Sequence, residues 1–232
     1  MHIPDGYLGP QTYGSFLAIM VPVWTMASRI LKRQFQTRQV PMFAMSAAFC
    51  FVVMMFNIPI PGGTSGHATG AALVGILLGP WAAVMAVSIA LIIQALLFGD
   101  GGITAIGANC FNTAVVVPTV GYWTYRFLAE GSKVESTRRM ISAGVAGYIS
   151  LNVSALIVAI QLGVQPLIAK NALGQPLYSP FPLQVTVPVM ASTHLLFFGF
   201  AEALITAGVF RYFQKSDPAM LQSVSLPRPH IA

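Results

Sequence analysis

The first two residues of the chain, Met1 and His2, hold the atoms needed to chelate a transition-metal ion. The α-amine and the backbone nitrogen of His2 close a five-membered ring with the metal. That backbone nitrogen and the His2 Nδ1 atom close a six-membered ring. Three nitrogens in one plane leave a fourth corner open, and square-planar nitrogen sites suit Ni²⁺ or Cu²⁺. The chemistry needs a free amine, and we expect Met1 to be retained because removal of an initiator methionine requires a small second residue.

A second histidine, His67, is the candidate for the fourth nitrogen. It follows segment 57–66, in which two prolines stiffen the start and three glycines allow close backbone approach. This composition suits a loop folded over a site, and it suits an ordinary tight connection equally well. Thr64 or Ser65 would either cap the next helix or hydrogen-bond a ligating ring. Without a metal, the same residues predict a solvated imidazole at His2 and a helix-capping His67.

Two further ionisable residues, His194 and Glu202, lie inside one apolar stretch, where an ionisable group is a functional hypothesis by default. Their spacing puts them about 80° apart around a helix and roughly 12 Å apart along its axis, so they do not form a direct pair. His194 lies near enough to the outer end to support a metal site there. Glu202 is better suited to a structural pairing or a contact with a partner. Asp5 would offset positive charge at a metal or form an Asx turn with Gly6.

The composition places these residues in a membrane protein. The 232 residues are 56% hydrophobic and 8% charged, whereas a soluble domain carries roughly a quarter charged residues. No nucleophile elbow, HExxH, Walker or paired-carboxylate motif is present, which disfavours an enzyme and excludes a nucleotide-binding domain within this sequence. Cys50 and Cys110 lie in apolar runs without CxxC spacing, and we expect both to be small buried hydrophobic residues.

Seven apolar stretches are expected to cross the bilayer as helices, each of which needs about 20 residues. They cover residues 13–31, 41–56, 66–78, 81–98, 103–128, 140–163 and 185–210. The third is short and glycine-rich, and its Gly75xxxGly79 spacing predicts close approach of another helix. We therefore predict an all-α membrane protein with one membrane domain over residues 1–232. Within it, residues 1–12 form a metal-binding segment, residues 13–213 a seven-helix bundle, and residues 214–232 a polar tail.

The basic residues predict the orientation of these spans, because inner loops of membrane proteins carry the excess of Lys and Arg. Of the 12 Lys and Arg residues, all but Lys170 fall on one side of a seven-span arrangement. We therefore expect the amino terminus outside and the carboxyl terminus inside, in the cell's inner (plasma) membrane. His2 and His67 then share the outer face. The distribution also argues against nucleic-acid binding, because the charges lie in inner loops and form no single basic face.

Three segments of the chain resemble the NikM/CbiM family. They are Met-His-Ile-Pro-Asp-Gly-Tyr-Leu at residues 1–8, Gly-His-Ala-Thr-Gly at residues 66–70, and residues 194–206, and the similarity runs to about residue 213. Members are the substrate-binding membrane subunits, or S components, of energy-coupling-factor nickel and cobalt transporters. The resemblance implies an amino terminus tucked into the protein from the outer side. It also implies an ion held by the Met1 amine, the His2 backbone nitrogen and ring, and the His67 ring.

The same resemblance implies partners and a cargo. The partners are a membrane coupling subunit, cytoplasmic ATPase subunits and often a small accessory membrane subunit. The Pro-Asp-Gly-Tyr start and the Gly-Gly-Thr-Ser-Gly-His segment are more similar to the nickel branch, so Ni²⁺ is the favoured substrate and Co²⁺ the alternative. The cobalt branch more often has Met-Glu-Gly after Ile and a Cys-Ser-His loop. A metal-dependent intramembrane enzyme or receptor is a further alternative, whereas a channel would need a weaker, multi-site path.

Overall fold

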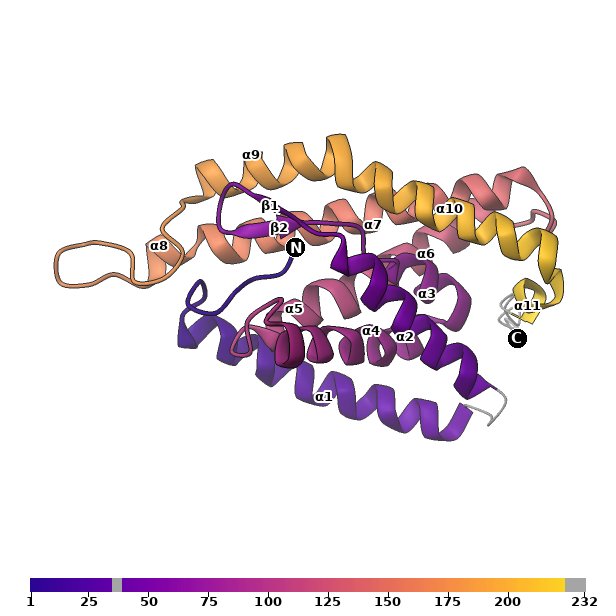
Figure 1. The fold of residues 1–232 in the computed structure, drawn as a ribbon, viewed down its shortest axis with the longest axis horizontal. Helices are drawn as coiled ribbons and strands as arrows, with labels where there is room; N and C mark the ends of the chain where they lie inside the picture. The colour runs from indigo at the N-terminus through magenta and orange to yellow at the C-terminus, as the bar shows by residue number, and fades with distance from the viewer. Residues whose placement is uncertain (35–38, 224–232) are drawn as a thin grey trace, which may run out of the picture.

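The computed structural model of the protein describes residues 1–34 and 39–223, and these are mostly helical (Figure 1). A small hairpin joins β1 (Ile58–Ile60) to β2 (Thr64–Gly66). The helices are α1 (Pro10–Gln34), α2 (Val40–Met55), α3 (Ala71–Leu78), α4 (Pro80–Ile93), α5 (Ile106–Cys110), α6 (Val117–Ala129), α7 (Thr137–Gly163), α8 (Gln165–Ile168), α9 (Leu183–Thr193), α10 (Gly199–Ser216) and α11 (Pro218–Ser223). Three π-helical turns are η2 (Gln94–Phe98), η3 (Phe111–Val116) and η4 (His194–Phe198).

Each predicted apolar stretch is helical over most of its length. The turn η2 extends α4, η3 joins α5 to α6, and η4 joins α9 to α10 without a break. Within the described residues, four helical stretches are long and apolar enough to cross a membrane, namely residues 10–33, 80–98, 137–168 and 183–216, and α2 is a shorter apolar helix. Large apolar side chains also face outward, such as Phe127 (78% exposed) and Leu204 (74% exposed). The all-α membrane class is therefore confirmed.

The third predicted helix begins later than its composition indicated. The prediction started at residue 66, but α3 starts at Ala71, because residues 64–66 pair with residues 58–60 as an antiparallel hairpin. The hairpin turn uses Gly62 and Gly63 at φ 97° and 81°, a backbone region that favours glycine. The hairpin moves His67 out of the helix and into the short loop between β2 and α3.

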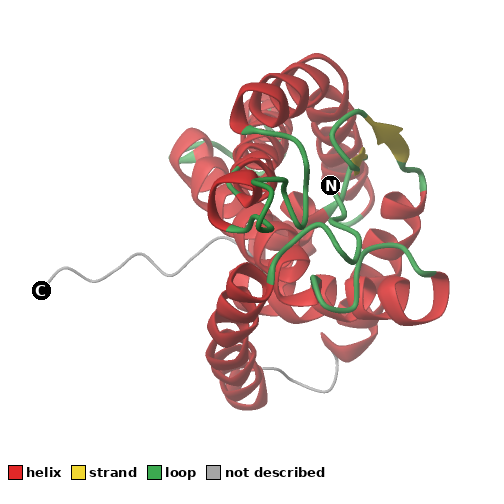
Figure 2. Cartoon of the chain, turned by 90° about the vertical axis from the view of Figure 1, so that its left-hand side faces the viewer, coloured by secondary structure: helices red, strands yellow, loops and turns green. Residues whose placement is uncertain are grey.

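The two ends of the bundle differ in what they carry (Figure 1). The β1–β2 hairpin, the loop around α8 and the amino terminus lie toward the left-hand end. The carboxyl ends of α1 and α10 and the α6–α7 connection lie at the right-hand end. Figure 2, which looks onto the left-hand end, places the amino terminus among the surrounding helices and loops rather than outside them.

Packing inside the bundle agrees with two of the predictions. A Cβ on Gly75 would lie 2.5 Å from the carbonyl oxygen of Pro118, so the small residue allows α3 and α6 to approach closely within this chain. Cys50 and Cys110 are both free and buried. In the predicted tail, α10 continues to Ser216 and α11 follows. Residues 35–38 and 224–232 lie outside the described residues, and the division into segment, bundle and tail stays a prediction.

Candidate metal centre

The first three residues are held inside the bundle by paired hydrogen bonds. Met1 and Ile3 are fully buried (0% exposed). The Asn109 side chain on α5 accepts a hydrogen bond from the Ile3 backbone N–H (2.9 Å) and donates one to the Ile3 carbonyl oxygen (3.0 Å). The backbone N–H of Gly102 donates to the same carbonyl oxygen (2.8 Å). The amino terminus is thus fixed in the interior by one amide side chain and one backbone contact.

Strand β2 lies beside the two terminal residues. The Thr64 hydroxyl donates to the His2 carbonyl oxygen (2.8 Å), and the Met1 amine lies 3.4 Å from Ser65 Oγ, to which it donates. The residue at the N-cap of α3 is Gly70 rather than Thr64 or Ser65. The expectation that Thr64 or Ser65 caps this helix was therefore wrong, because both belong to the hairpin. Their hydroxyls instead support the amino terminus.

His2 and His67 come together although 64 residues separate them in the chain. Their ring centroids are 4.5 Å apart and their planes are inclined by 45°. The Nδ1 atom of His67 lies 2.9 Å from the carbonyl oxygen of Ala68, so Nδ1 carries the proton and donates it there. That assignment leaves His67 Nε2 as a bare lone pair, and the atom is buried without a hydrogen-bond partner. His67 therefore presents a nitrogen that is suited to a metal.

The ring of His2 has a carboxylate partner, Asp100, that the sequence reasoning missed. His2 Nδ1 lies 2.8 Å from Asp100 Oδ1, and the other carboxylate oxygen accepts a hydrogen bond from Asn57 Nδ2 (2.8 Å). Burial alone would raise the pKa of Asp100, but the hydrogen bonds from His2 and Asn57 and the nearby positive groups hold it below its usual range. Chelation through Nδ1 requires the His2 ring to give up this contact, because the same atom cannot serve both partners.

Burial also controls the charge of the amino terminus. It lowers the pKa of the Met1 amine well below its ordinary value, against the opposing effect of Asp100. Burial likewise lowers the pKa of the His2 ring, and the hydrogen bond to Asp100 only partly offsets this. Uncharged nitrogens with free lone pairs are the form in which an amine and an imidazole bind a metal.

Side chains alone do not complete a metal site in this structure. Among residues 1–34 and 39–223, no three His, Cys, Asp or Glu side chains are grouped so that they could hold an ion. His2 and His67 together offer two ring nitrogens, and the main chain beside them carries further nitrogens. The Met1 amine and the His2 backbone nitrogen are the atoms at hand, and together with the two rings they make a four-nitrogen set.

Two features near the terminus serve as anchors. Asp5 accepts hydrogen bonds from the backbone N–H groups of Ile103 (3.1 Å) and Thr104 (2.8 Å), so its carboxylate holds the start of the next segment. The connection after α7 also reaches the terminal segment. Its Gln165 side chain accepts from the Gly9 N–H (3.0 Å), and the backbone of residue 179 donates to the carbonyl of residue 7 (3.1 Å). This connection braces the residues after the candidate ligands.

His194 and Glu202 are both fully buried, and each has hydrogen-bond partners other than the other residue. His194 Nδ1 lies 2.9 Å from the Met190 carbonyl oxygen, and its Nε2 is buried without a partner. The turn η4 packs against the hairpin, because a Cβ on Gly66 would fall 1.9 Å from the Phe198 ring. Glu202 contacts the loop that follows His67, as described below.

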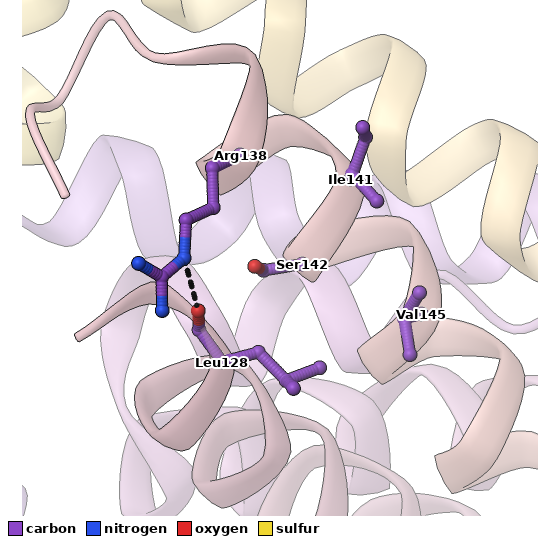
Figure 3. Close-up of a pocket in the computed structure, with 5 residues that line it drawn as sticks. All are labelled: Leu128, Arg138, Ile141, Ser142 and Val145. Atoms are coloured by element: carbon purple, nitrogen blue, oxygen red, sulfur yellow. Dashed lines mark hydrogen bonds between the residues drawn. The ribbon is translucent and has the colours of Figure 1, made fainter.

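A separate hollow lies at the opposite end of the bundle, between α6 and α7 (Figure 3). Leu128, Ile141 and Val145 give it an apolar lining, and the Arg138 Nε atom donates a hydrogen bond to the Leu128 carbonyl oxygen (2.9 Å). None of its lining residues belongs to the candidate metal centre. The hollow is therefore separate from the candidate metal centre.

The Asn109 contacts lead to a first prediction. Replacing Asn109 with Leu removes both side-chain hydrogen bonds to Ile3, and we expect the free energy of opening the terminal segment to fall by about 2 kcal/mol. Amide hydrogen exchange at residues 1–8 should accelerate accordingly. The matched control is Asn112→Leu, because Asn112 pairs with Gln161 (2.7 and 2.9 Å) away from the terminus. Faster exchange at residues 1–8 in the control but not in N109L would contradict this assignment.

The chain is similar to members of one protein family over nearly its whole length. The family model described as the cobalt uptake substrate-specific transmembrane region, CbiM, matches residues 2–220. The fused nickel transport protein NikMN of Rhodobacter capsulatus is 50% identical over 100% of this chain and 67% of its own length. LarMN of Lactiplantibacillus plantarum, named a probable fused nickel transport protein, is 44% identical over 95% of this chain and 66% of its own. The chain thus spans about two thirds of these relatives.

A crystal structure described as a transition metal transporter has the same fold. It superposes with a TM-score of 0.88 at 49% identity and covers 93% of each chain. The family match covers well over half of the chain and both relatives exceed 40% identity, so the likeness extends beyond the fold. The chain therefore belongs to the CbiM/NikM family of membrane proteins, whose relatives described above are named as nickel transport proteins.

Proposed function

We propose that this protein is the substrate-specific subunit of an ATP-driven nickel uptake transporter and captures Ni²⁺ from the outer side of the plasma membrane. The observation that carries the proposal is the burial of the Met1 amine beside His2 and His67, where the His67 Nε2 atom lacks a partner. A buried polar atom without a hydrogen bond is costly, and a bound ion would satisfy it.

In this proposal the ligands are the Met1 amine, the His2 backbone nitrogen, the His2 ring and His67 Nε2. The proton that His2 Nδ1 donates to Asp100 would move to the unpartnered Nε2 atom of the same ring, which would free Nδ1 for the ion. Loss of the backbone amide proton to solvent would complete the planar set. Ser65 and Thr64 hold the terminus in place from β2. Such a site favours an ion that adopts square-planar geometry, as Ni²⁺ does.

The choice between nickel and cobalt rests on two observations that point in different directions. Both relatives described above are named as nickel transport proteins, whereas the family description names cobalt uptake. A planar set of four strong nitrogen donors favours Ni²⁺ over Co²⁺ in the general affinity order. Nickel is therefore the proposed substrate, and cobalt is the second candidate. Competition between the two ions for the purified protein, read as the amount of each retained, discriminates them.

The proposed partners supply the energy that this chain has no motif to supply. They are a membrane coupling subunit, cytoplasmic ATPase subunits and a small accessory membrane subunit. We further propose seven spans, with the amino terminus outside and the carboxyl terminus inside. The arrangement of the helix ends supports this, because the basic ends of α1, α7 and α10 lie opposite the amino terminus (Figure 1). Nickel accumulation in cells that carry the partner subunits should stop when the ATPase is inactivated, and uptake without an ATPase would refute the proposal.

The lowered pKa of the Met1 amine predicts how many protons leave on binding. Because burial lowers the pKa, the amine is less protonated at neutral pH than an exposed amine would be, so nickel should displace fewer protons per ion than it would from an exposed Met-His terminus. An exposed amine, mostly protonated at that pH, would raise the count to about two. Calorimetry in buffers of different ionisation enthalpy measures the number, and a value near two would contradict the lowered pKa of the buried amine.

The same pKa shifts fix the direction of the pH dependence. The folded Met1 amine and His2 ring bind fewer protons than they do in the unfolded chain, so metal-free stability rises with pH between each lowered value and the ordinary one. Nickel binding weakens as the pH falls through the lowered values, because protons then compete for the same nitrogens. A thermal-unfolding series of the metal-free protein against pH checks the sign.

A further inference from the structure

The buried carboxylate of Glu202 contacts the loop between His67 and α3. Its Oε2 atom accepts hydrogen bonds from the backbone N–H groups of Thr69 (2.6 Å) and Gly70 (3.0 Å). Its Oε1 atom accepts one from the Thr69 hydroxyl (3.2 Å). Glu202 is 0% exposed, and each of these contacts is a donor to the carboxylate. A carboxylate in a membrane interior is costly to bury, so this arrangement of donors requires a reason beyond packing.

One peptide unit links this carboxylate to the metal-facing ring. The peptide between Ala68 and Thr69 donates its N–H to Glu202 Oε2, and its carbonyl oxygen accepts the proton of His67 Nδ1 (2.9 Å). A peptide unit is planar, so fixing the direction of its N–H also fixes the direction of its carbonyl oxygen. The carbonyl in turn fixes the tautomer and the orientation of the His67 ring, which leaves Nε2 bare.

A second contact, at Gly70, fixes the path of the loop between His67 and α3. Gly70 has φ 68°, and a Cβ there would lie 2.5 Å from the Phe49 ring, so only glycine fits. The loop from His67 to α3 is thus pressed against α2 on one side and hydrogen-bonded to α10 on the other. Glu202 is the contact that ties the loop to α10, a helix that contributes none of the proposed ligands.

We propose that Glu202 is a positioning residue for metal capture and acts on His67 through the Ala68–Thr69 peptide. The inference deepens the proposed function and rests on it. Glu202 orients the peptide, the peptide carbonyl holds His67 Nδ1–H, and His67 Nε2 faces the amino terminus. Movement of α10 relative to α3 would therefore change the direction of a metal ligand, which gives the transport cycle a mechanical link to ion release.

The test compares Glu202→Gln with a control one turn along the same helix. A glutamine offers one acceptor oxygen in place of two and carries no charge, so the hydrogen bonds that orient the peptide become weaker. We expect Ni²⁺ to bind about 10- to 100-fold more weakly in E202Q, as for other residues that orient a ligating histidine. Its visible absorption band should also shift. The control is Thr206→Val, because Thr206 is buried and its hydroxyl has no partner, and both readouts should match the wild type.

A milder variant decides the question if E202Q does not fold. Thr69→Ala keeps the backbone N–H bonds to Glu202 but removes the hydroxyl contact to Oε1, together with the hydrogen bond that the hydroxyl accepts from the Ala71 N–H (3.2 Å), and should weaken Ni²⁺ binding by roughly fivefold. The experiment uses the full chain with a native amino terminus and NiCl₂ alone as the probe. If E202Q and T69A both keep the wild-type affinity and spectrum, the inference about Glu202 is overturned and the proposed function stands. The same holds if E202Q does not fold and T69A keeps the wild-type affinity and spectrum. A wild-type protein that binds no stoichiometric nickel would instead overturn the proposed function and this inference with it.

Discussion

A protein whose Met1 amine is acetylated or extended by one residue is expected to bind Ni²⁺ more than about 100-fold more weakly than the native protein, a larger loss than removal of a supporting residue causes. Either change replaces an amine lone pair with an amide nitrogen and removes one member of the chelate. It also adds atoms where the structure has little room, because Met1 is buried and its amine lies 3.4 Å from Ser65 Oγ. Metal retained after gel filtration measures the effect.

The control for this experiment places the same extension at the carboxyl terminus. The last described helix, α11 (Pro218–Ser223), lies at the end of the bundle opposite the β1–β2 hairpin (Figure 1). Nickel binding by this variant should equal that of the native protein. If the amino-terminally extended protein bound nickel as tightly as the control, the assignment of the Met1 amine would be wrong.

Substitution of His67 by Ala is expected to have the second largest effect. The variant loses the nitrogen that closes the planar set, and water or another oxygen donor takes its place. We expect more than about 100-fold weaker binding and an absorption band at longer wavelength, because a weaker donor replaces an imidazole. Equilibrium competition with a chelator of known affinity measures the loss of Ni²⁺ affinity, and absorption spectroscopy measures the shift of the band.

His194 offers a matched comparison for His67. Both rings are buried, both donate Nδ1–H to a backbone carbonyl, and both have an Nε2 atom without a partner. The four proposed nitrogens are supplied without His194, so His194→Asn should keep the wild-type absorption band. A band shifted equally by both substitutions would contradict the proposed ligand set.

The sequence was sufficient for the parts that depend on local pattern. Apolar stretches of helix length predicted the helices because burial in lipid requires continuous apolar segments. The pairing of His2 with His67 was anticipated from metal chemistry and from the family resemblance, and the structure brings the two rings within 4.5 Å. Their role as ligands stays a prediction.

Other parts depend on contacts between distant segments and leave little local signal. Asp100 meets His2 across 98 residues, and Asn109 meets Ile3 across 106. Neither Asp100 nor Asn109 lies in a recognisable sequence motif, because residues that contact a non-repetitive segment do not recur at a regular spacing. The hairpin that precedes His67 was likewise hidden, since its strands are only three residues long and were read as part of a loop and a helix.

The contact of Glu202 is another one that the sequence does not reveal. Its position inside an apolar stretch marked it as functional or structurally paired, but the sequence did not identify what it pairs with. Its partners, the N–H groups of Thr69 and Gly70, are backbone groups that every sequence has. Only the three-dimensional structure shows that Glu202 contacts the loop that follows His67.

The central claim is that the buried amino terminus and two histidines form one four-nitrogen nickel site. The most direct test is metal analysis with visible absorption of the purified full chain, produced with a free Met1 amine and incubated with Ni²⁺. We expect one nickel per chain and a yellow, diamagnetic species, as square-planar Ni²⁺ with four nitrogen donors requires. A protein that retains no stoichiometric metal, or that holds nickel in a paramagnetic octahedral form, would contradict it.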